Sequence, residues 1–190
     1  EFVAAADLLQ AKARLLATGF VVPAVVDDGT LRLVGARHPL LLIAKDQVVA
    51  NDIHMDETIR VLVISGPNTG GKTVTLKIVG LFALMVRAGL HLPCAPESEM
   101  ALFTQCYADI GDAQDLSRDL SSFSAHITQM VRLLSDAGER AEAGESAVPR
   151  SLVLLDEPVT STDPHEGAAL AEALLCRLAA LKLLKIANIA

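Results

Sequence analysis

The stretch that decides the fold of this chain is Gly66-Pro67-Asn68-Thr69-Gly70-Gly71-Lys72-Thr73. It fits the phosphate-binding pattern G-x-x-x-x-G-K-[ST]. Residues 61–65, just before it, are apolar and rich in β-branched side chains, which predicts a buried strand. Residues 74–87, just after it, contain no helix breaker except Gly80, which predicts a helix. Strand, glycine loop and helix form the setting in which this pattern binds phosphate.

Each part of this loop has its own task in phosphate binding. The glycines allow the backbone to curl so that successive N–H groups point at phosphate oxygens. The start of the helix adds unpaired N–H groups and a positive dipole end, and Val74 closes the predicted binding segment. Lys72 is expected to reach the β- and γ-phosphates, and the Thr73 hydroxyl to bind a magnesium ion. The alternative is a glycine-rich turn that carries a surface lysine.

A second segment, residues 151–157 (Ser-Leu-Val-Leu-Leu-Asp-Glu), supports the first. Its apolar run suits a central parallel strand that is covered on both faces, and ligands bind at the carboxyl ends of such strands. Asp156 is then placed to hold the magnesium ion, directly or through water. Glu157 is a candidate general base for the attacking water. The alternative is a strand that ends in a solvated acidic turn.

The composition fits one domain of 190 residues with room for a small extra element. Apolar residues make up 52% of the chain, and the mean hydropathy is +0.42, which is high for a soluble monomer. One Tyr, five Phe and no Trp leave the core to Leu, Val, Ala and Ile. Some of the apolar surplus is expected to face a partner chain or a neighbouring domain.

Charge and targeting signals limit the possible partners. The net charge of −7 and the scattered basic residues argue against nucleic-acid binding by this chain alone. The longest apolar run, residues 78–86, is too short to span a membrane. The N-terminus shows no signal peptide, and the three cysteines have no metal-binding spacing, so a reducing cytoplasmic location is expected.

The rest of the chain predicts a coarse order of elements. Residues 2–18 predict a helix that Gly19 closes. Short β-like pieces are predicted at residues 21–26, 31–34, 40–43 and 47–50. A hairpin turn is predicted at Asp28-Gly29. The later elements are predicted as a strand at 101–107, a helix at 121–134, a surface connection at 135–150 and a helix at 164–184. No strand is expected after the last helix.

Taken together, these segments resemble the ATPase domain of the MutS family. The likeness is greatest to its second bacterial branch, whose members carry a C-terminal Smr-type nuclease domain. It extends over about residues 1–175, and the motifs keep the family's order and spacing. The motifs lie at residues 37–40 (RHPL), 51–52 (ND), 66–77 (GPNTGGKTVTLK), 88–93 (AGLHLP), 108–112 (ADIGD), 120–126 (LSSFSAH), 162–164 (TDP) and 166–169 (EGAA).

The resemblance implies a P-loop NTPase of the α/β class, with an ABC-ATPase-like mixed sheet flanked by helices and truncated at its C-terminus. Residues 1–19 would be the end of an upstream helical core or lever domain. Residues 20–190 would be an ABC-like ATPase domain that is incomplete at its C-terminus. The family's downstream sensor histidine is missing, and His165 lies too early to replace it.

The resemblance also implies composite sites for ATP or ADP and Mg²⁺ at a homodimer interface. Ser121 and Ser122 match the serine-rich signature that touches the γ-phosphate from the other subunit, although they also suit a plain N-cap. Residues 47–52 match the adenine-side segment. There Val49 and the valine before it stand in place of the aromatic residue that the mismatch-repair branch often has. His38 suits a nucleotide contact and a turn histidine before proline equally well.

The sequence departs from the branch after Glu157. The branch continues Leu-Gly-x-Gly-Thr-Asp, whereas residues 158–163 read Pro-Val-Thr-Ser-Thr-Asp. The loss of two glycines restricts the backbone angles of a loop that is expected to communicate between subunits. This change is expected to affect the interface loop and, with it, the rate of hydrolysis.

These observations favour an ATPase that serves as the dimerising domain of a MutS-like DNA-processing protein, in recombination control or a related DNA transaction. Lys72 and Glu157 are its expected catalytic residues. DNA or a ribonucleoprotein would bind through domains outside this chain. No membrane partner is expected. The alternative is a nucleotide-binding and dimerisation module with little turnover. It draws on the altered loop, on the expected lack of a last strand and on the apolar surplus. A transporter-type ABC subunit is disfavoured because the usual signature of that class, Leu-Ser-Gly-Gly-Gln, is missing. Residues 120–123 read Leu-Ser-Ser-Phe in its place.

Overall fold

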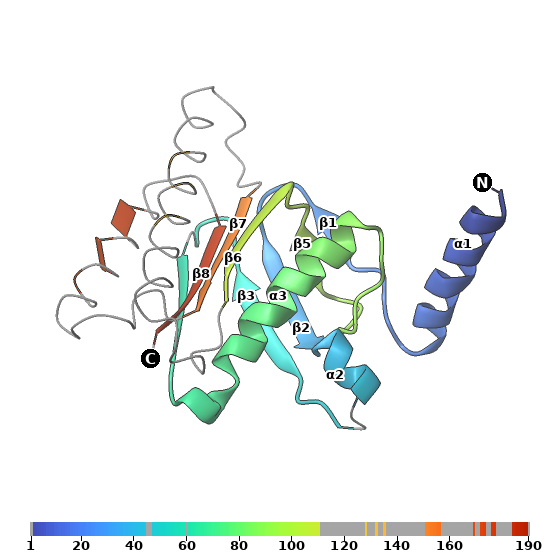
Figure 1. Ribbon diagram of the computed structural model, residues 1–190, viewed down its shortest axis with the longest axis horizontal. Helices are drawn as coiled ribbons and strands as arrows, with labels where there is room; N and C mark the ends of the chain where they lie inside the picture. Colours follow the sequence, from blue (N-terminus) through green and yellow to red (C-terminus); the bar gives the residue numbers. More distant parts are fainter. Residues whose placement is uncertain are drawn as a thin grey trace.

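A computed structural model describes residues 2–44, 47–59, 61–110, 128, 132, 135, 151–156, 169, 172–173, 176–177 and 184–189. The helices within this part are α1 (Phe2–Ala17), α2 (Pro39–Ala44) and α3 (Lys72–Arg87), with a 3-10 turn η1 (Asn68–Gly70). The strands are β1 (Ala24–Val26), β2 (Leu31–Ala36), β3 (Asn51–Met55), β4 (Val61–Ser65), β5 (Glu99–Ala101), β6 (Gln105–Asp109), β7 (Ser151–Asp156) and β8 (Leu184–Ile189). Figure 1 labels most of these elements along the chain.

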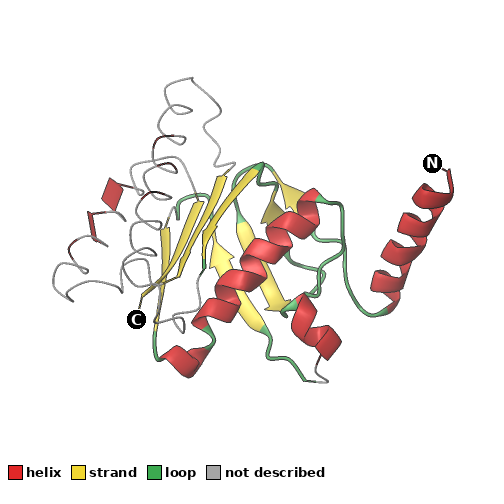
Figure 2. Ribbon diagram, viewed as in Figure 1, coloured by secondary structure: helices red, strands yellow, loops and turns green. Residues whose placement is uncertain are grey.

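The strands form two four-stranded sheets rather than the single mixed sheet that was expected (Figure 2). The first has the order β1-β5-β2-β3 and is mixed, because β5 runs parallel to β1 and antiparallel to β2. The second has the order β4-β8-β7-β6 and is parallel throughout. The α/β class is therefore confirmed.

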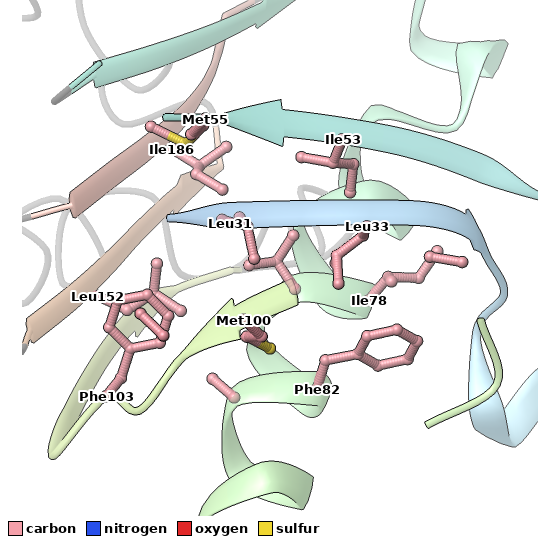
Figure 3. Packing of buried hydrophobic residues seen from close by; sticks show 14 of the residues in the cluster. Leu31, Leu33, Ile53, Met55, Ile78, Phe82, Met100, Phe103, Leu152 and Ile186 are labelled. Carbon is pink, nitrogen blue, oxygen red and sulfur yellow. The ribbon is translucent and has the colours of Figure 1, made fainter. Parts of the chain in front are cut away.

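One hydrophobic core joins α3 to both sheets. Ile78 and Phe82 of α3 are fully buried, and Figure 3 shows them beside Leu33 and Met100 of the first sheet. The second sheet contributes the strand β7, whose first five residues are all buried. This burial confirms the prediction of a central parallel strand that is covered on both faces.

Gly80 allows α3 to approach the second sheet closely. A Cβ atom at this position would lie 2.8 Å from Cδ1 of Leu154 on β7. We expect Gly80→Val to lower the free energy of unfolding by about 1–3 kcal/mol, because the added methyl groups overpack this contact. Chemical denaturation measures the change. Leu84→Val, on the exposed side of the same helix, is the control and should cost about 0.5 kcal/mol or less; equal stability of the two variants would contradict the close approach.

Residues 40–43 form part of helix α2 instead of the predicted β-like piece. Pro39 occupies the first helical position, where its fixed φ and its missing N–H are both tolerated. The carbonyl oxygen of His38 accepts hydrogen bonds from the backbone N–H groups of Leu41 and Leu42, each at 3.1 Å, which closes the first turn. The piece predicted at residues 47–50 is also wrong, because the strand begins only at Asn51.

The turn at Asp28-Gly29 exists but does not close a hairpin. Gly29 has a φ of 89°, and the Asp28 carboxylate accepts a hydrogen bond from the Thr30 N–H at 2.8 Å. However, β5 lies between β1 and β2, so the strands on either side of the turn are not neighbours. The strand predicted at 101–107 is likewise divided, because β5 belongs to the first sheet and β6 to the second.

The strand β8 corrects the prediction for the end of the chain. The helix expected at 164–184 is described only at residues 169, 172–173 and 176–177, which are helical. Leu184, where that helix was predicted to end, instead begins β8. β8 pairs in parallel with both β4 and β7, so the expectation that no strand follows the helix is wrong. The predicted helix at 121–134 falls almost entirely outside the described residues, and residues 128 and 132 are helical.

Helix α1 confirms the predicted N-terminal helix, and it lies apart from the two sheets (Figure 1). None of its residues is buried, and apolar side chains such as Phe2 and Leu9 are largely exposed. Gly19, with a φ of 89°, follows its last turn as expected. In the described part of the chain, no helix is both long enough and apolar enough to cross a membrane.

Candidate functional site

The glycine-rich stretch forms a tight loop between β4 and α3. Gly66 and Gly71 have φ values of 145° and 80°, in a region that side chains with a Cβ atom rarely adopt. Between them, the Gly70 N–H donates a hydrogen bond to the carbonyl oxygen of Pro67 at 2.9 Å and closes the turn η1. The glycines at both ends therefore allow the chain to curl from the sheet into the helix.

Lys72 is the first residue of α3 and is only 4% exposed. Its Nζ donates a hydrogen bond to the carbonyl oxygen of Gly66. The side chain is therefore folded back across the loop instead of extending into solvent. Its positive charge lies at the end of α3 where the first backbone N–H groups have no partner within the helix. Both features favour an anion at this place.

The first turn of α3 contains two further predicted site residues, Thr73 and Val74. Thr73 and Val74 are half-buried, while Thr69 is exposed. The carbonyl oxygen of Gly71 accepts hydrogen bonds from the N–H of Thr75 at 2.9 Å and from its Oγ1 at 3.1 Å. These two bonds fix the helix start against the loop.

Asp156 lies at the edge of the second sheet from which the loop leaves. It ends β7 and is paired in register with Asn188 of β8, which is itself paired with Ile64 of β4. Because the three strands are parallel, their carboxyl ends meet at one edge. At about 4.8 Å per strand, the backbones of Asp156 and Ile64 are about 10 Å apart. Glu157, Ser121 and Ser122 lie outside the described residues.

Two residues near this site were not among the predicted site residues. Asp109 ends β6 at the same sheet edge and is 9% exposed. Its position at the end of a strand next to β7 could have been a signal, but the order of the strands was needed to see it. Lys77 lies close enough to His38 to act on its charge. This approach depends on how α3 packs, and no sequence pattern indicates it.

His38 and Val49 lie at one end of the first sheet. Ala36 of β2 is paired with Asn51 of β3, so the segments that contain His38 and Val49 leave the sheet together. His38 is 8% exposed, and its Nδ1 has no hydrogen-bond partner among the described residues. Burial lowers the pKa of His38, and the positive charge of Lys77 lowers it further. Val49, in contrast, is 82% exposed.

The lowered pKa of His38 predicts a loss of stability in mild acid. An unfolded histidine binds a proton near pH 6.5, whereas the folded protein resists protonation at this site. The unfolded state therefore gains protons first as the pH falls through 6.5. Between pH 7.5 and 5.5, the free energy of unfolding should fall further in the wild type than in His38→Gln.

Urea denaturation at several pH values measures this difference. His54→Gln, which makes the same exchange at an exposed position on β3, is the matched control. The prediction would be contradicted if the free energy of unfolding of His38→Gln depended on pH as strongly as that of the wild type.

The family described as MutS domain V matches residues 62–186, which include the loop, α3 and β7. The chain belongs to the MutS family. It is 48% identical over 170 residues to the Endonuclease MutS2 of Bacillus velezensis, a match that covers 89% of this chain and 20% of that protein. The Putative endonuclease MutS2 of Bacillus subtilis is also 48% identical, and the Endonuclease MutS2 of Listeria monocytogenes is 46% identical, with the same coverage.

These relatives place the MutS-family chain in the MutS2 branch, as the sequence motifs predicted. The chain spans about a fifth of the length of the curated relatives that it matches. The matched region covers the strands and helix that position Lys72 and Asp156. Lys72 and Asp156 therefore both lie within the region that matches MutS domain V.

The side chains at this MutS-family site also fit a magnesium ion. Thr73 and Asp156 offer a hydroxyl and a carboxylate oxygen, which are the hard ligands that Mg²⁺ prefers. Among the described residues, no three or more His, Cys, Asp or Glu side chains gather into a metal-binding group. Nucleotide-bound Mg²⁺ needs only one or two protein ligands, since phosphates and water complete its shell.

Proposed function

We propose that this chain is the ATP-binding and ATP-hydrolysing dimerisation domain of a MutS-like DNA-processing protein. The observation that carries the proposal is the buried Lys72 folded across a glycine loop at the sheet edge where Asp156 ends its strand. A buried ammonium group at the N-terminus of a long helix favours a polyanion such as a triphosphate. The membership of the MutS family supports the same proposal.

In this proposal, each predicted site residue has a defined role. The backbone of the loop from Gly66 to Thr73 binds the phosphates, and Lys72 stabilises the charge of the β- and γ-phosphates. Thr73 and Asp156 hold a magnesium ion, which supplies charge neutralisation between the phosphates. Glu157 accepts the proton of the attacking water.

The dimer completes the site from the other subunit. Ser121 and Ser122 of one chain touch the γ-phosphate that is bound on the other, so bound ATP joins the two surfaces and hydrolysis releases them. Residues 1–19 connect the ATPase domain, residues 20–190, to an upstream helical domain. For the whole protein, we propose that DNA or a ribonucleoprotein binds to other domains and that it acts in DNA recombination or repair, since the relatives are named endonucleases.

The measurement of molar mass by light scattering tests this proposal. With magnesium and a non-hydrolysable ATP analogue, we expect the mass to rise from about one chain toward twice that value. Ser121→Ala combined with Ser122→Ala should reduce this rise, because the contact to the γ-phosphate is lost. The proposed activity would be contradicted if the molar mass did not change and calorimetry detected no nucleotide binding.

A module that binds nucleotide with little turnover is the second candidate. The altered loop at residues 158–161 still favours it, because two glycine positions of the branch are replaced. The apolar surplus of the chain also favours it. A third support is removed, since β8 supplies the strand that was expected to be missing. Tight nucleotide binding without release of phosphate would favour this candidate over the ATPase.

A further inference from the structure

We infer that Asp109 is a positioning residue for the magnesium ion of this site and that it acts through a water molecule bound to the ion. The inference rests on the proposed function, because it needs magnesium-ATP on the loop. It adds a third side chain to Thr73 and Asp156, which are the direct ligands in that proposal.

The first step concerns the distance between the two carboxylates. Asp109 is paired in register with Leu155 of β7, and Asp156 is the next residue on that strand. With about 4.8 Å between strands and about 3.3 Å per residue, the Cα atoms of Asp109 and Asp156 are about 6 Å apart. Both residues end parallel strands, so they lie at the sheet edge where a ligand would bind.

The second step concerns the two faces of the sheet. Leu154 lies on the face that carries α3, because a Cβ atom at Gly80 of that helix would lie 2.8 Å from its Cδ1 atom. Side chains alternate along a strand, so Asp156 is on the α3 face and Leu155 is on the other. Register partners on neighbouring strands share a face, which puts Asp109 on the face of Leu155. The two carboxylates therefore flank the end of the sheet from opposite sides.

The third step concerns the kind of contact with the ion. Thr73 is in the first turn of α3 and Asp156 is on the α3 face, so both can bind one ion directly. Mg²⁺ needs octahedral oxygen ligands at about 2.0–2.1 Å and keeps several bound water molecules. A carboxylate that approaches from the opposite face is suited to accept a hydrogen bond from one of these water molecules, because such indirect partners orient the ligands of a metal.

The fourth step concerns the charge of Asp109. This residue is only 9% exposed, and Val153 and Leu155 on the same face of the sheet are 0% and 2% exposed. Water therefore screens the charge of Asp109 less than it screens a carboxylate on the surface. A carboxylate attracts Mg²⁺ but repels a triphosphate that carries no metal. Asp109 should therefore strengthen the binding of magnesium-ATP and should not strengthen the binding of metal-free ATP.

Calorimetric titration of Asp109→Asn with a non-hydrolysable ATP analogue, at a series of magnesium concentrations, tests the inference. The magnesium concentration for half-maximal binding should rise about 10-fold, as is typical when an indirect partner of a metal is lost. In EDTA, the analogue should bind to the variant at least as well as to the wild type, because a negative charge near the triphosphate is removed. Asp109→Glu keeps the charge and should restore most of the affinity for magnesium. Asp27→Asn, at an exposed position after β1, is the matched control and should change neither measurement.

Two results would overturn the inference while the proposed function stands. One is a magnesium requirement of Asp109→Asn equal to that of the wild type, in an assay in which Asp156→Asn raises it. The other is an equal weakening of binding with and without magnesium, or a loss of fold by circular dichroism, because either shows that Asp109 supports the structure instead of the ion. If Lys72→Ala leaves the binding of the ATP analogue unchanged, the proposed function itself fails, and this variant distinguishes that outcome from the other two.

Discussion

Lys72→Ala should weaken the binding of magnesium-ATP by at least about 100-fold. The lysine is almost fully buried and lies across the loop, so a bound triphosphate would meet its charge at short range with little solvent screening. One or two charge-assisted hydrogen bonds contribute about 1.5–3 kcal/mol each. A loss of about 2.7 kcal/mol corresponds to 100-fold in Kd. Calorimetry or the fluorescence of a labelled ATP analogue measures the change.

The control for this variant is Lys12→Ala. Lys12 places its Nζ near Gly89, just beyond the opposite end of α3, so its removal should leave the Kd unchanged within about 2-fold. Lys72→Ala should remain folded, because it removes a buried charge and leaves most of the core intact. Equal affinity of Lys72→Ala and the wild type, with both folded by circular dichroism, would refute the role of the loop.

Glu157→Gln should reduce the steady-state release of phosphate by about 10²–10⁴-fold, which is the typical contribution of a general base. The amide keeps the size of the side chain but cannot accept the proton of the attacking water. Nucleotide affinity should stay within a few-fold of the wild type, because the phosphate loop is untouched. The variant should therefore accumulate in the ATP-bound dimeric state, which light scattering with ATP itself would detect.

A companion variant separates the two neighbouring carboxylates. Asp156→Asn should raise the magnesium concentration that is needed for half-maximal activity, because one charged ligand of the ion is lost. Glu97→Gln, at an exposed position before β5, is the neutral control. Hydrolysis by Glu157→Gln at the wild-type rate would show that the water is activated by another group.

The central part of the fold could be predicted from the sequence because its local signals agree. β4 and β7 are continuous apolar runs, and α3 is a long segment that starts at the glycine loop. The glycine loop between them favours a strand before it and a helix after it. The prediction that residues 61–65 form a buried strand is wrong in one respect, because β4 is an edge strand among the described strands of its sheet and none of its residues is buried. The meeting of the loop and Asp156 at one sheet edge also followed from the parallel pattern.

The errors arose where a short apolar segment fits more than one structure. Residues 40–43 are apolar enough for a strand, and only Pro39 at the first helical position indicates the helix. Residues 184–189 continue an Ala- and Leu-rich pattern, so periodicity alone could not reveal a strand. The burial of His38 beside Lys77 depends on long-range packing, which no local pattern contains.

The position of β8 has a consequence for how the protein is made. This strand comes after β4, β6 and β7 in the chain but fills the space between β4 and β7. During synthesis, the second sheet therefore cannot close until residues 184–189 have left the ribosome, and until then the facing edges of β4 and β7 have no partner. Such late, non-local pairing slows folding and exposes unpaired edges to aggregation. A nascent polypeptide of this kind depends on a segment that is translated later to protect strands that were translated earlier.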